Sequence, residues 1–153
     1  MVKALFLDRD GTINIDYGYV YQPEKFDFID GIFDFCKKAQ DLGYLIIVIT
    51  NQSGIARKYY TEEDYQKCTS YMIDKFKEQG ITITDVFHCP ELTGPDRKPE
   101  CGLFLKAQQK HNIDMSQSIS VGDKERDIIA ARKAGIEQNF LFQNNYFDLI
   151  NKL

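Results

Sequence analysis

The fold can be worked out from VKALFLDRDGT, residues 2–12. Residues 2–7 are apolar apart from Lys3, and this length suits a strand that is buried on both faces. Asp8 and Asp10 follow directly, and the period-two geometry of a strand points both carboxylates the same way. We therefore predict a buried strand with two acids at its carboxyl end.

The remainder of the chain alternates between apolar strand patterns and amphipathic helical patterns. Strands are expected at residues 44–49, 85–89, 118–121 and 139–142, and helices at residues 32–42, 61–79, 102–111 and 127–134. This alternation is typical of a mainly parallel sheet that is covered by helices on both faces. We predict a three-layer α/β/α, Rossmann-like fold in one domain over residues 1–153, with no separate cap domain.

The composition is that of an ordinary globular protein, with 43% hydrophobic and 27% charged residues in a chain of 153. The formal net charge of −4 argues against a general nucleic-acid binder, which usually has a basic face. It does not exclude an anionic substrate, because a few local cations and a metal can reverse the field inside one cleft.

The cysteines and the N-terminal sequence indicate where in the cell the protein is expected. The four cysteines contain no CxxC pair, so we expect reduced thiols. The N-terminus has no apolar segment of signal-peptide type, and no run approaches the ~20 apolar residues of a membrane span. We expect a cytoplasmic monomer without membrane or nucleic-acid partners.

The chemically suggestive residues lie just after the expected strands, where open α/β sheets bind their ligands. They are Asp8 and Asp10, Thr50 and Asn51, Arg97 and Lys98, and Gly122 and Asp123. Because four separate strands each supply such residues, we expect the residues to converge on one site.

Acids at two of these strand ends predict a metal site. Two neighbouring carboxylates repel each other unless a cation binds between them, and Mg²⁺ prefers such hard oxygen ligands. Asp123 could complete the protein's share of the ligands. Asp8 could then attack a phosphate covalently, while Asp10 moves the protons. The alternative is a turn in which the acids and Gly11 have only a structural role.

Several other sequence features near the expected strand ends each allow two interpretations. Residues 50–54 could hold phosphate oxygens or simply end a strand, and Arg97 with Lys98 could bind an anion or remain solvated. Asp127 could orient metal-bound water or stabilise a helix N-terminus. Lys124 could pair with one of the first-strand acids or face solvent.

Taken together, these motifs resemble the haloacid dehalogenase (HAD) superfamily of phosphohydrolases. The matching residues are Asp8-Arg9-Asp10-Gly11-Thr12, Thr50, Lys98 and Gly122-Asp123-Lys124. Within the superfamily the chain is similar to the histidinol-phosphatase and heptose-bisphosphatase branch, over nearly all of residues 3–142. The resemblance includes NQSGIAR, residues 51–57, and the Arg97-Lys98-Pro99 run.

The resemblance implies a role for each matching position. Asp8 would be the nucleophile and a magnesium ligand, and Asp10 the general acid/base, with its backbone carbonyl at the metal. Asp123 would be the third protein ligand, with Lys124 adjacent, while Thr50 and Lys98 would stabilise the phosphoryl group. The residues expected to shape the substrate site are Asp16, Tyr17, Gly18, Tyr19, Asn51, Gln52, Ser53 and Arg97.

The same resemblance implies a small phosphorylated metabolite as substrate, foremost the 7-phosphate of a heptose 1,7-bisphosphate. Histidinol phosphate and other small sugar phosphates are the alternatives, although histidinol phosphatases more often have Asp at the position of Ser53. The product would enter lipopolysaccharide core or surface-glycan synthesis.

The zinc loop of the branch is incomplete in this chain. Cys89 matches one ligand, but Glu91, Gly94 and Asp96 stand where the other three would be, and a tetrahedral site needs four. We expect no zinc, and a metal role for Cys89, Cys101 or His88 is left open.

A non-enzymatic alternative is a phospho-receiver domain, which also places acids, a Thr and a Lys around magnesium. In that class the phosphorylated Asp follows the third strand. The strand expected at residues 85–89 has no Asp at its end, which favours the phosphatase interpretation.

Overall fold

Five parallel strands form the sheet in the computed structural model, which describes residues 1–143 and 145–153. The strand order is β3-β2-β1-β4-β5, and each neighbouring pair is parallel. The strands are β1 (Ala4–Leu7), β2 (Leu45–Asn51), β3 (Asp85–Cys89), β4 (Ile119–Gly122) and β5 (Gln138–Leu141). Leu7 pairs with Val48 on one side and Val121 on the other, so β1 is central.

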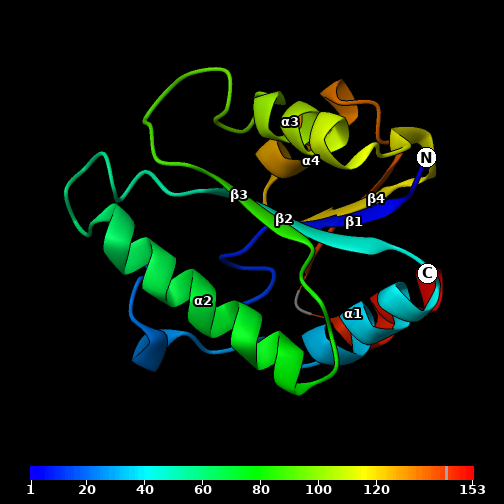
Figure 1. Ribbon diagram of the computed structural model, residues 1–153, viewed down its shortest axis with the longest axis horizontal. Helices are drawn as coiled ribbons and strands as arrows, with labels where there is room; N and C mark the ends of the chain where they lie inside the picture. Colours follow the sequence, from blue (N-terminus) through cyan, green and yellow to red (C-terminus); the bar gives the residue numbers. More distant parts are fainter. Residues whose placement is uncertain (144) are drawn as a thin grey trace.

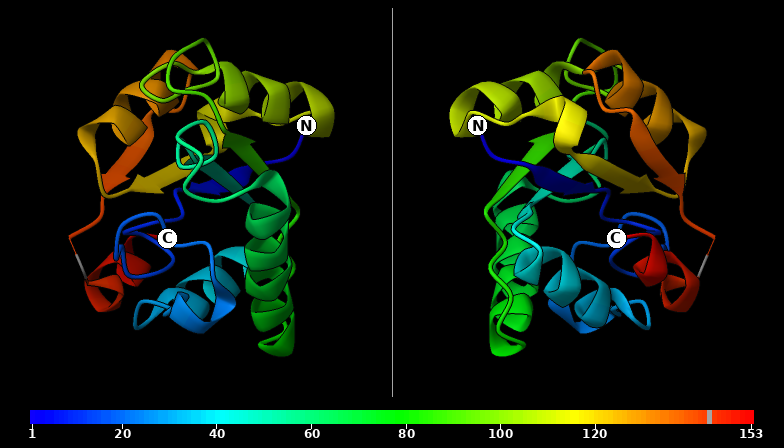
Figure 2. Two further views of the ribbon diagram at one scale, coloured as in Figure 1. Left: turned by 90° about the vertical axis from the view of Figure 1, so that its left-hand side faces the viewer. Right: turned by 90° about the vertical axis from the view of Figure 1, so that its right-hand side faces the viewer.

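Helices cover both faces of this sheet (Figures 1 and 2). One face carries α1 (Ile32–Asp41), α2 (Glu62–Glu78) and the short α5 (Tyr146–Leu149), and the other carries α3 (Gly102–His111) and α4 (Glu125–Lys133). Single 3₁₀ turns lie at Pro23–Lys25, Met115–Gln117 and Ile150–Lys152. This is the predicted α/β class with its helix, sheet and helix layers.

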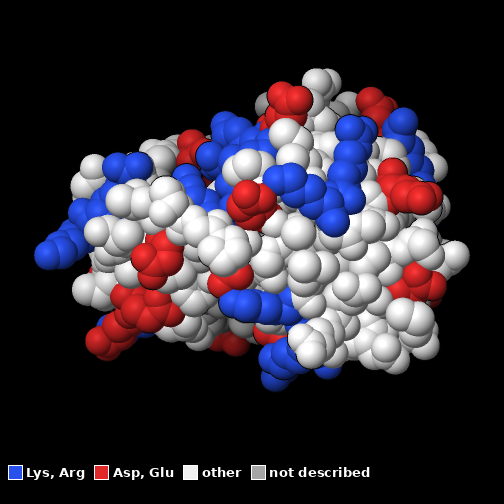
Figure 3. Space-filling model, turned by 90° about the horizontal axis from the view of Figure 1, so that it is seen from above, with Lys and Arg blue, Asp and Glu red and all other residues white. Residues whose placement is uncertain are grey.

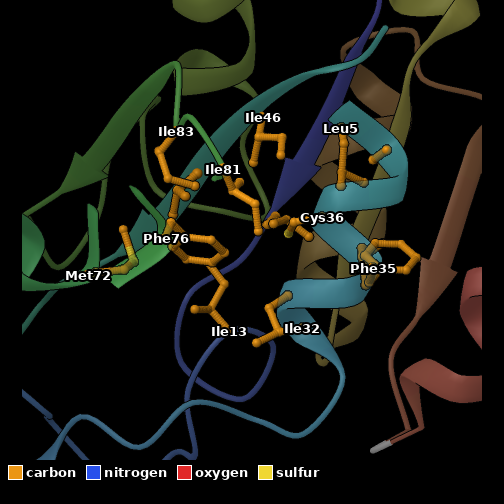
Figure 4. Close-up of a cluster of buried hydrophobic side chains, with 14 of the residues drawn as sticks. Leu5, Ile13, Ile32, Phe35, Cys36, Ile46, Met72, Phe76, Ile81 and Ile83 are labelled. Atoms are coloured by element: carbon orange, nitrogen blue, oxygen red, sulfur yellow. The ribbon is translucent and has the colours of Figure 1, made fainter. Parts of the chain in front are cut away.

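The alternation of side chains along the strands creates two cores. Leu5 and Leu7 of β1 pack with the residues of α1, α2 and α5, while Ala4 and Phe6 pack with those of α3 and α4. Figure 4 shows the first core, in which Phe35 of α1 and Phe76 of α2 meet the sheet. Because both faces are buried, the strands can be apolar throughout, as the sequence pattern of β1 predicts.

The helix that begins at Glu62 is fixed by local chemistry. The Thr61 hydroxyl accepts a hydrogen bond from the Asp64 amide at 3.0 Å, and the Asp64 carboxylate accepts one from the Thr61 amide at 3.0 Å. This capping box satisfies two amides that the first helical turn leaves without partners.

The expected boundaries are correct to within two residues at most ends, with one difference that affects the site. We predicted that Thr50 and Asn51 follow the second strand, but both belong to it, because they pair with His88 and Cys89 of β3. The helix expected from residue 127 begins at Glu125, and β5 is shifted by one residue.

Among the described residues, the helices are too short or too polar to cross a membrane.

Candidate active site

A cavity of about 270 Å³ opens at the carboxyl ends of the strands. Ten of the residues expected at the site line it: Asp8, Asp10, Asp16, Gly18, Tyr19, Asn51, Gln52, Ser53, Arg97 and Lys124. Arg57, Tyr60 and Arg126 line it as well, without having been predicted. Strand-end side chains from distant parts of the sequence therefore share one concave surface.

Lys98 is the most constrained charged group of the site. Its ammonium lies 2.8 Å from Asp8 Oδ1, 2.7 Å from Asp127 Oδ1 and 2.7 Å from the Ile49 carbonyl oxygen. These three acceptors match the three N–H donors of an ammonium. Its side chain is only 2% exposed, so Lys98 is a buried charge held between two carboxylates rather than a free surface charge.

The pKa values of this buried group of charges follow from its geometry. Burial raises the pKa of Asp8 well above its usual range, Lys98 opposes that rise, and Asp127 adds to it. Burial lowers the pKa of Lys98, but the carboxylates of Asp8 and Asp127 outweigh that effect, so the net pKa is raised. Lys98 therefore remains a cation, whereas the charge on Asp8 depends on nearby cations.

The backbone of the loop that carries Lys98 is held by Asn51. The Asn51 Oδ1 accepts a hydrogen bond from the Lys98 amide at 3.0 Å, and its Nδ2 donates to the Lys98 carbonyl at 3.1 Å. We predicted that Asn51 shapes the substrate site, and it does line the cavity. Its two hydrogen bonds show that it also attaches the 90–101 loop to the end of β2.

Asp10 accepts hydrogen bonds from three side chains. Arg9 Nη2 donates at 2.9 Å, Asn14 Nδ2 at 3.0 Å and Gln52 Nε2 at 3.1 Å. Arg9 is 1% exposed and also donates to the Val20 carbonyl. Asp10 therefore lies in the cavity wall in one fixed orientation.

Gln52 connects Asp10 to the motif on β2. Its Nε2 also lies 2.9 Å from Thr50 Oγ1, and its Oε1 accepts a hydrogen bond from the Tyr60 hydroxyl. Thr50 is 1% exposed and does not itself line the cavity. The structure thus places Thr50 behind Gln52, next to the site rather than on its surface.

Three carboxylates could hold a metal ion. One oxygen each from Asp8, Asp123 and Asp127 lies within 4.8 Å of the others. Asp123 Oδ1 is buried without a hydrogen-bond partner among the described residues, so a ligand there would satisfy it. A Cβ atom at Gly11 would lie 2.1 Å from Asp123 Oδ2, which shows how closely the first motif approaches this acid. The residues present therefore fit a magnesium ion between Asp8 and Asp123.

The structure gives the protein contacts of Asp127 and Lys124, while a role of Asp127 toward metal-bound water stays a prediction, because Asp127 also belongs to the carboxylate group that could hold an ion. Asp127 Oδ2 accepts a hydrogen bond from the Lys124 amide at 3.0 Å and so caps α4, while its other oxygen pairs with Lys98. The ammonium of Lys124 lies 3.7 Å from Asp123 Oδ2, and its side chain is half exposed. Among the described residues its carboxylate neighbour is therefore Asp123 rather than the predicted Asp8 or Asp10, and its exposure agrees with the alternative that it faces solvent.

Tyr17 differs from its predicted place. Its ring is 57% exposed, and its hydroxyl donates a hydrogen bond to Asp27 at 2.6 Å. Asp16, Gly18 and Tyr19 line the cavity, but Tyr17 does not. Its hydrogen bond to Asp27 and the left-handed backbone at Gly18 and Tyr19 accompany this position outside the cavity lining.

Some residues of the site gave no clear signal in the sequence. Arg9 was visible as a charge between two acids, but its burial depends on Val20 and on the ring of Phe26, 5.7 Å away. Tyr60 lies three residues after the run at residues 51–57, and Arg126 lies two residues after Lys124, but neither belongs to a motif, and the structure shows that both line the cavity.

The parallel sheet, the acids at its rim and the buried lysine define the class of HAD-superfamily phosphatases. A family model described as polynucleotide kinase 3 phosphatase matches residues 3–145, and the chain belongs to this family.

Curated relatives narrow the comparison. The chain is 50% identical over 135 residues to D-glycero-alpha-D-manno-heptose-1,7-bisphosphate 7-phosphatase of Campylobacter jejuni, covering 88% of this chain and 78% of the relative. It is also 47% identical over 147 residues to D-glycero-beta-D-manno-heptose-1,7-bisphosphate 7-phosphatase of Helicobacter pylori. This match covers 94% of this chain and 85% of the relative. The chain also matches the solved structure of D,D-heptose 1,7-bisphosphate phosphatase from B. bronchiseptica, which is complexed with magnesium and phosphate. The TM-score is 0.87 and the sequence identity 25%, and the match covers 98% of this chain and 86% of that chain.

Proposed function

We propose that this phosphatase removes the 7-phosphate of a D-glycero-D-manno-heptose 1,7-bisphosphate through a covalent phosphoryl intermediate on Asp8. The observation that carries the proposal is the placement of Asp8, which lies at the cavity and is held 2.8 Å from the buried ammonium of Lys98. The names of the relatives from C. jejuni and H. pylori support the heptose substrate.

The proposed reaction has two steps in which the chain's own groups exchange bonds and protons. In the first step an oxygen of Asp8 bonds to phosphorus, the ester P–O bond breaks, and Asp10 gives its proton to the leaving oxygen. In the second step a water attacks phosphorus, Asp10 takes its proton, and the bond between Asp8 and phosphorus breaks to release phosphate. Lys98 offsets the negative charge around Asp8 in both steps.

Magnesium is the proposed metal, with Asp8, Asp123 and the backbone carbonyl of Asp10 as the protein's ligands. The buried, unpartnered oxygen of Asp123 and the magnesium in the B. bronchiseptica structure support this choice. When bound, Mg²⁺ would polarise the phosphate and screen the approach of an anionic nucleophile. We propose that zinc is not needed, because the loop at residues 89–101 has Glu91, Gly94 and Asp96 where zinc ligands would be expected.

The charge distribution supports a small phosphorylated sugar rather than a polynucleotide as substrate. Lys and Arg are interspersed with Asp and Glu on the face that carries α3 and α4 (Figure 3), and the net charge is −4. Arg57, Arg97, Lys124 and Arg126 lie at the cavity itself, where they would attract a compact anion.

The test is phosphate release from a panel of substrates. The panel contains both anomers of the heptose bisphosphate, histidinol phosphate, simple sugar phosphates and a 3′-phosphorylated oligonucleotide. We expect the highest kcat/KM on a heptose bisphosphate, loss of turnover in Asp8→Asn and Asp10→Asn, and loss of activity in EDTA that Mg²⁺ restores. Metal analysis of the purified protein measures zinc directly.

Three outcomes would contradict separate parts of the proposal. A higher kcat/KM on the oligonucleotide or on histidinol phosphate than on the heptose bisphosphates would contradict the proposed substrate. Turnover by a folded Asp8→Asn variant would contradict the covalent intermediate on Asp8. Stoichiometric zinc in the purified protein would contradict the proposal that the loop at residues 89–101 does not need zinc.

A further inference from the structure

Two aromatic pairs join two loops that both line the cavity. Tyr19, in the loop at residues 16–21, contacts Tyr59, in the loop at residues 54–60, with ring centroids 4.8 Å apart at 78°. Tyr21 and Tyr60 of the same two loops stack at 5.1 Å and 12°. Tyr19 and Tyr60 line the cavity, so each pair places one ring in its wall.

The loop at residues 54–60 is shaped to bring these rings together. The Tyr59 amide donates to the Gly54 carbonyl at 2.9 Å, which closes the loop on itself. A Cβ atom at Gly54 would lie 2.1 Å from the Tyr60 ring and 3.0 Å from the Tyr19 ring, so only glycine permits this approach. Lys58, with φ of 63°, turns the backbone just before Tyr59.

Tyr19 itself has a φ of 52°, in the left-handed region that residues with a side chain adopt only where their surroundings hold them. Tyr59 is one of those surroundings, because its ring meets the ring of Tyr19. Both residues remain about half exposed, at 48% for Tyr19 and 56% for Tyr59. The pair is therefore an aromatic surface at the rim of a cavity whose base is highly charged.

An aromatic rim and a charged base suit different parts of one substrate. The carboxylates and cations suit a phosphoryl group, while an aromatic face offers apolar contact to carbon-bound hydrogens, as in the carbon skeleton of a sugar. Tyr60 has a different role, because it is buried and its hydroxyl donates to Gln52.

We propose that Tyr59 is a positioning residue that holds Tyr19 against the carbon skeleton of a phosphorylated sugar and thereby favours sugar phosphates over phosphate alone. This inference rests on the proposed function for the class of substrate, a sugar phosphate. Tyr59 contacts no reacting atom and acts only through the ring of Tyr19.

The experiment compares Tyr59→Ala and Tyr59→Phe with wild type. Each protein is assayed for KM and kcat on the sugar phosphate that the wild type hydrolyses best, and for the inhibition constant of inorganic phosphate. A T-shaped pair contributes enough to change binding by about fivefold. We therefore expect KM to rise about fivefold in Tyr59→Ala, with kcat and the phosphate inhibition constant nearly unchanged, and Tyr59→Phe to behave like wild type. Phe147→Ala is the control, because Phe147 is 68% exposed on α5.

An unchanged KM in Tyr59→Ala would overturn the inference. So would an inhibition constant for phosphate that rises as much as KM, because the variant would then have damaged the phosphoryl end of the site. Equal effects of Ala and Phe would show that the ring is not the active feature. If the protein does not hydrolyse a heptose bisphosphate, the proposed substrate is wrong. The inference about Tyr59 can still be tested, because KM is then compared on another sugar phosphate.

Discussion

Asp127→Asn tests whether the buried lysine depends on its second carboxylate. Asp127 is 5% exposed, with one oxygen 2.7 Å from Lys98 Nζ and the other 3.0 Å from the amide of Lys124. An asparagine has nearly the same shape, and its carbonyl can still cap α4. With the asparagine oxygen on the Lys124 amide, its NH2 group faces Lys98, so the substitution removes the negative charge and the acceptor beside Lys98 while it keeps the cap.

The magnitude follows from what Lys98 retains. Removing one partner of a buried ion pair costs about 3–5 kcal/mol when the remaining charge is left uncompensated. Here Lys98 still has Asp8 at 2.8 Å and the Ile49 carbonyl at 2.7 Å. We therefore expect a smaller loss of unfolding free energy, about 2 kcal/mol. We also expect kcat to fall at least ~10-fold, equivalent to about 1.4 kcal/mol, because Lys98 is less firmly held beside Asp8.

The assay is urea unfolding in magnesium-free buffer, followed by phosphate release with magnesium. Glu125→Gln is the matched control, because it removes a charge from the same first turn of α4 without a contact to Lys98 among the described residues. Its unfolding free energy should stay within about 0.5 kcal/mol of wild type. If Asp127→Asn behaves like this control in both assays, then Lys98 does not need Asp127, and our account of the site is wrong.

Three further predictions concern the surroundings of Asp8. Gly11→Ala should raise the Mg²⁺ concentration for half-maximal activity at least ~10-fold, since Gly11 has φ of 88° and a Cβ would meet Asp123 Oδ2 at 2.1 Å; an unchanged magnesium titration would contradict this. Tyr146→Phe should cost about 1–2 kcal/mol in urea unfolding, because a buried hydroxyl that donates to the Thr12 carbonyl at 2.6 Å is lost; a neutral result would contradict it. The raised pKa of Lys98 means that its stabilising charge is complete below the ordinary lysine pKa of about 10.4 and is lost only as pH rises through the folded-state value. Unfolding free energy measured against pH should therefore show no loss from this group near pH 8, and a Lys98-dependent loss there would refute the assignment.

Sequence reasoning succeeded where local pattern and chain direction were enough. Asp8, Asp10 and Asp123 follow strong strand patterns, and parallel strands bring their carboxyl ends to the same edge. The pairing of Lys98 with Asp127 was not visible, because two elements on the same face of the sheet meet only after folding. The end of β2 was misjudged for a similar reason, since Thr50 and Asn51 are in the strand only through their partners on β3.

The aromatic contacts at the cavity could not be predicted from the sequence either, because they form between rings that meet only after folding. Nothing near Gly54 in the sequence indicates that Tyr19 and Tyr60 will approach it so closely. We expect contacts of this kind to bear on substrate preference, because the roles proposed for the acids and the lysine concern the phosphoryl group alone. Substrate preference is therefore expected to depend on the loops at residues 16–21 and 54–60 more than on the strand ends.

The charges at the base of the cavity favour the binding of a cation at these strand ends. Asp8, Asp123 and Asp127 can bring oxygens within 4.8 Å of one another, and Lys98 supplies the positive charge that lies among them. Burial is the main reason that the pKa of Asp8 is raised, and the carboxylates of Asp127 and Asp123 add to the rise while Lys98 opposes it. A raised pKa opposes the ionised form that a nucleophile needs. A divalent cation beside Asp8 and Asp123 would oppose that rise, so the same arrangement that disfavours the free carboxylate would activate it once the metal is bound.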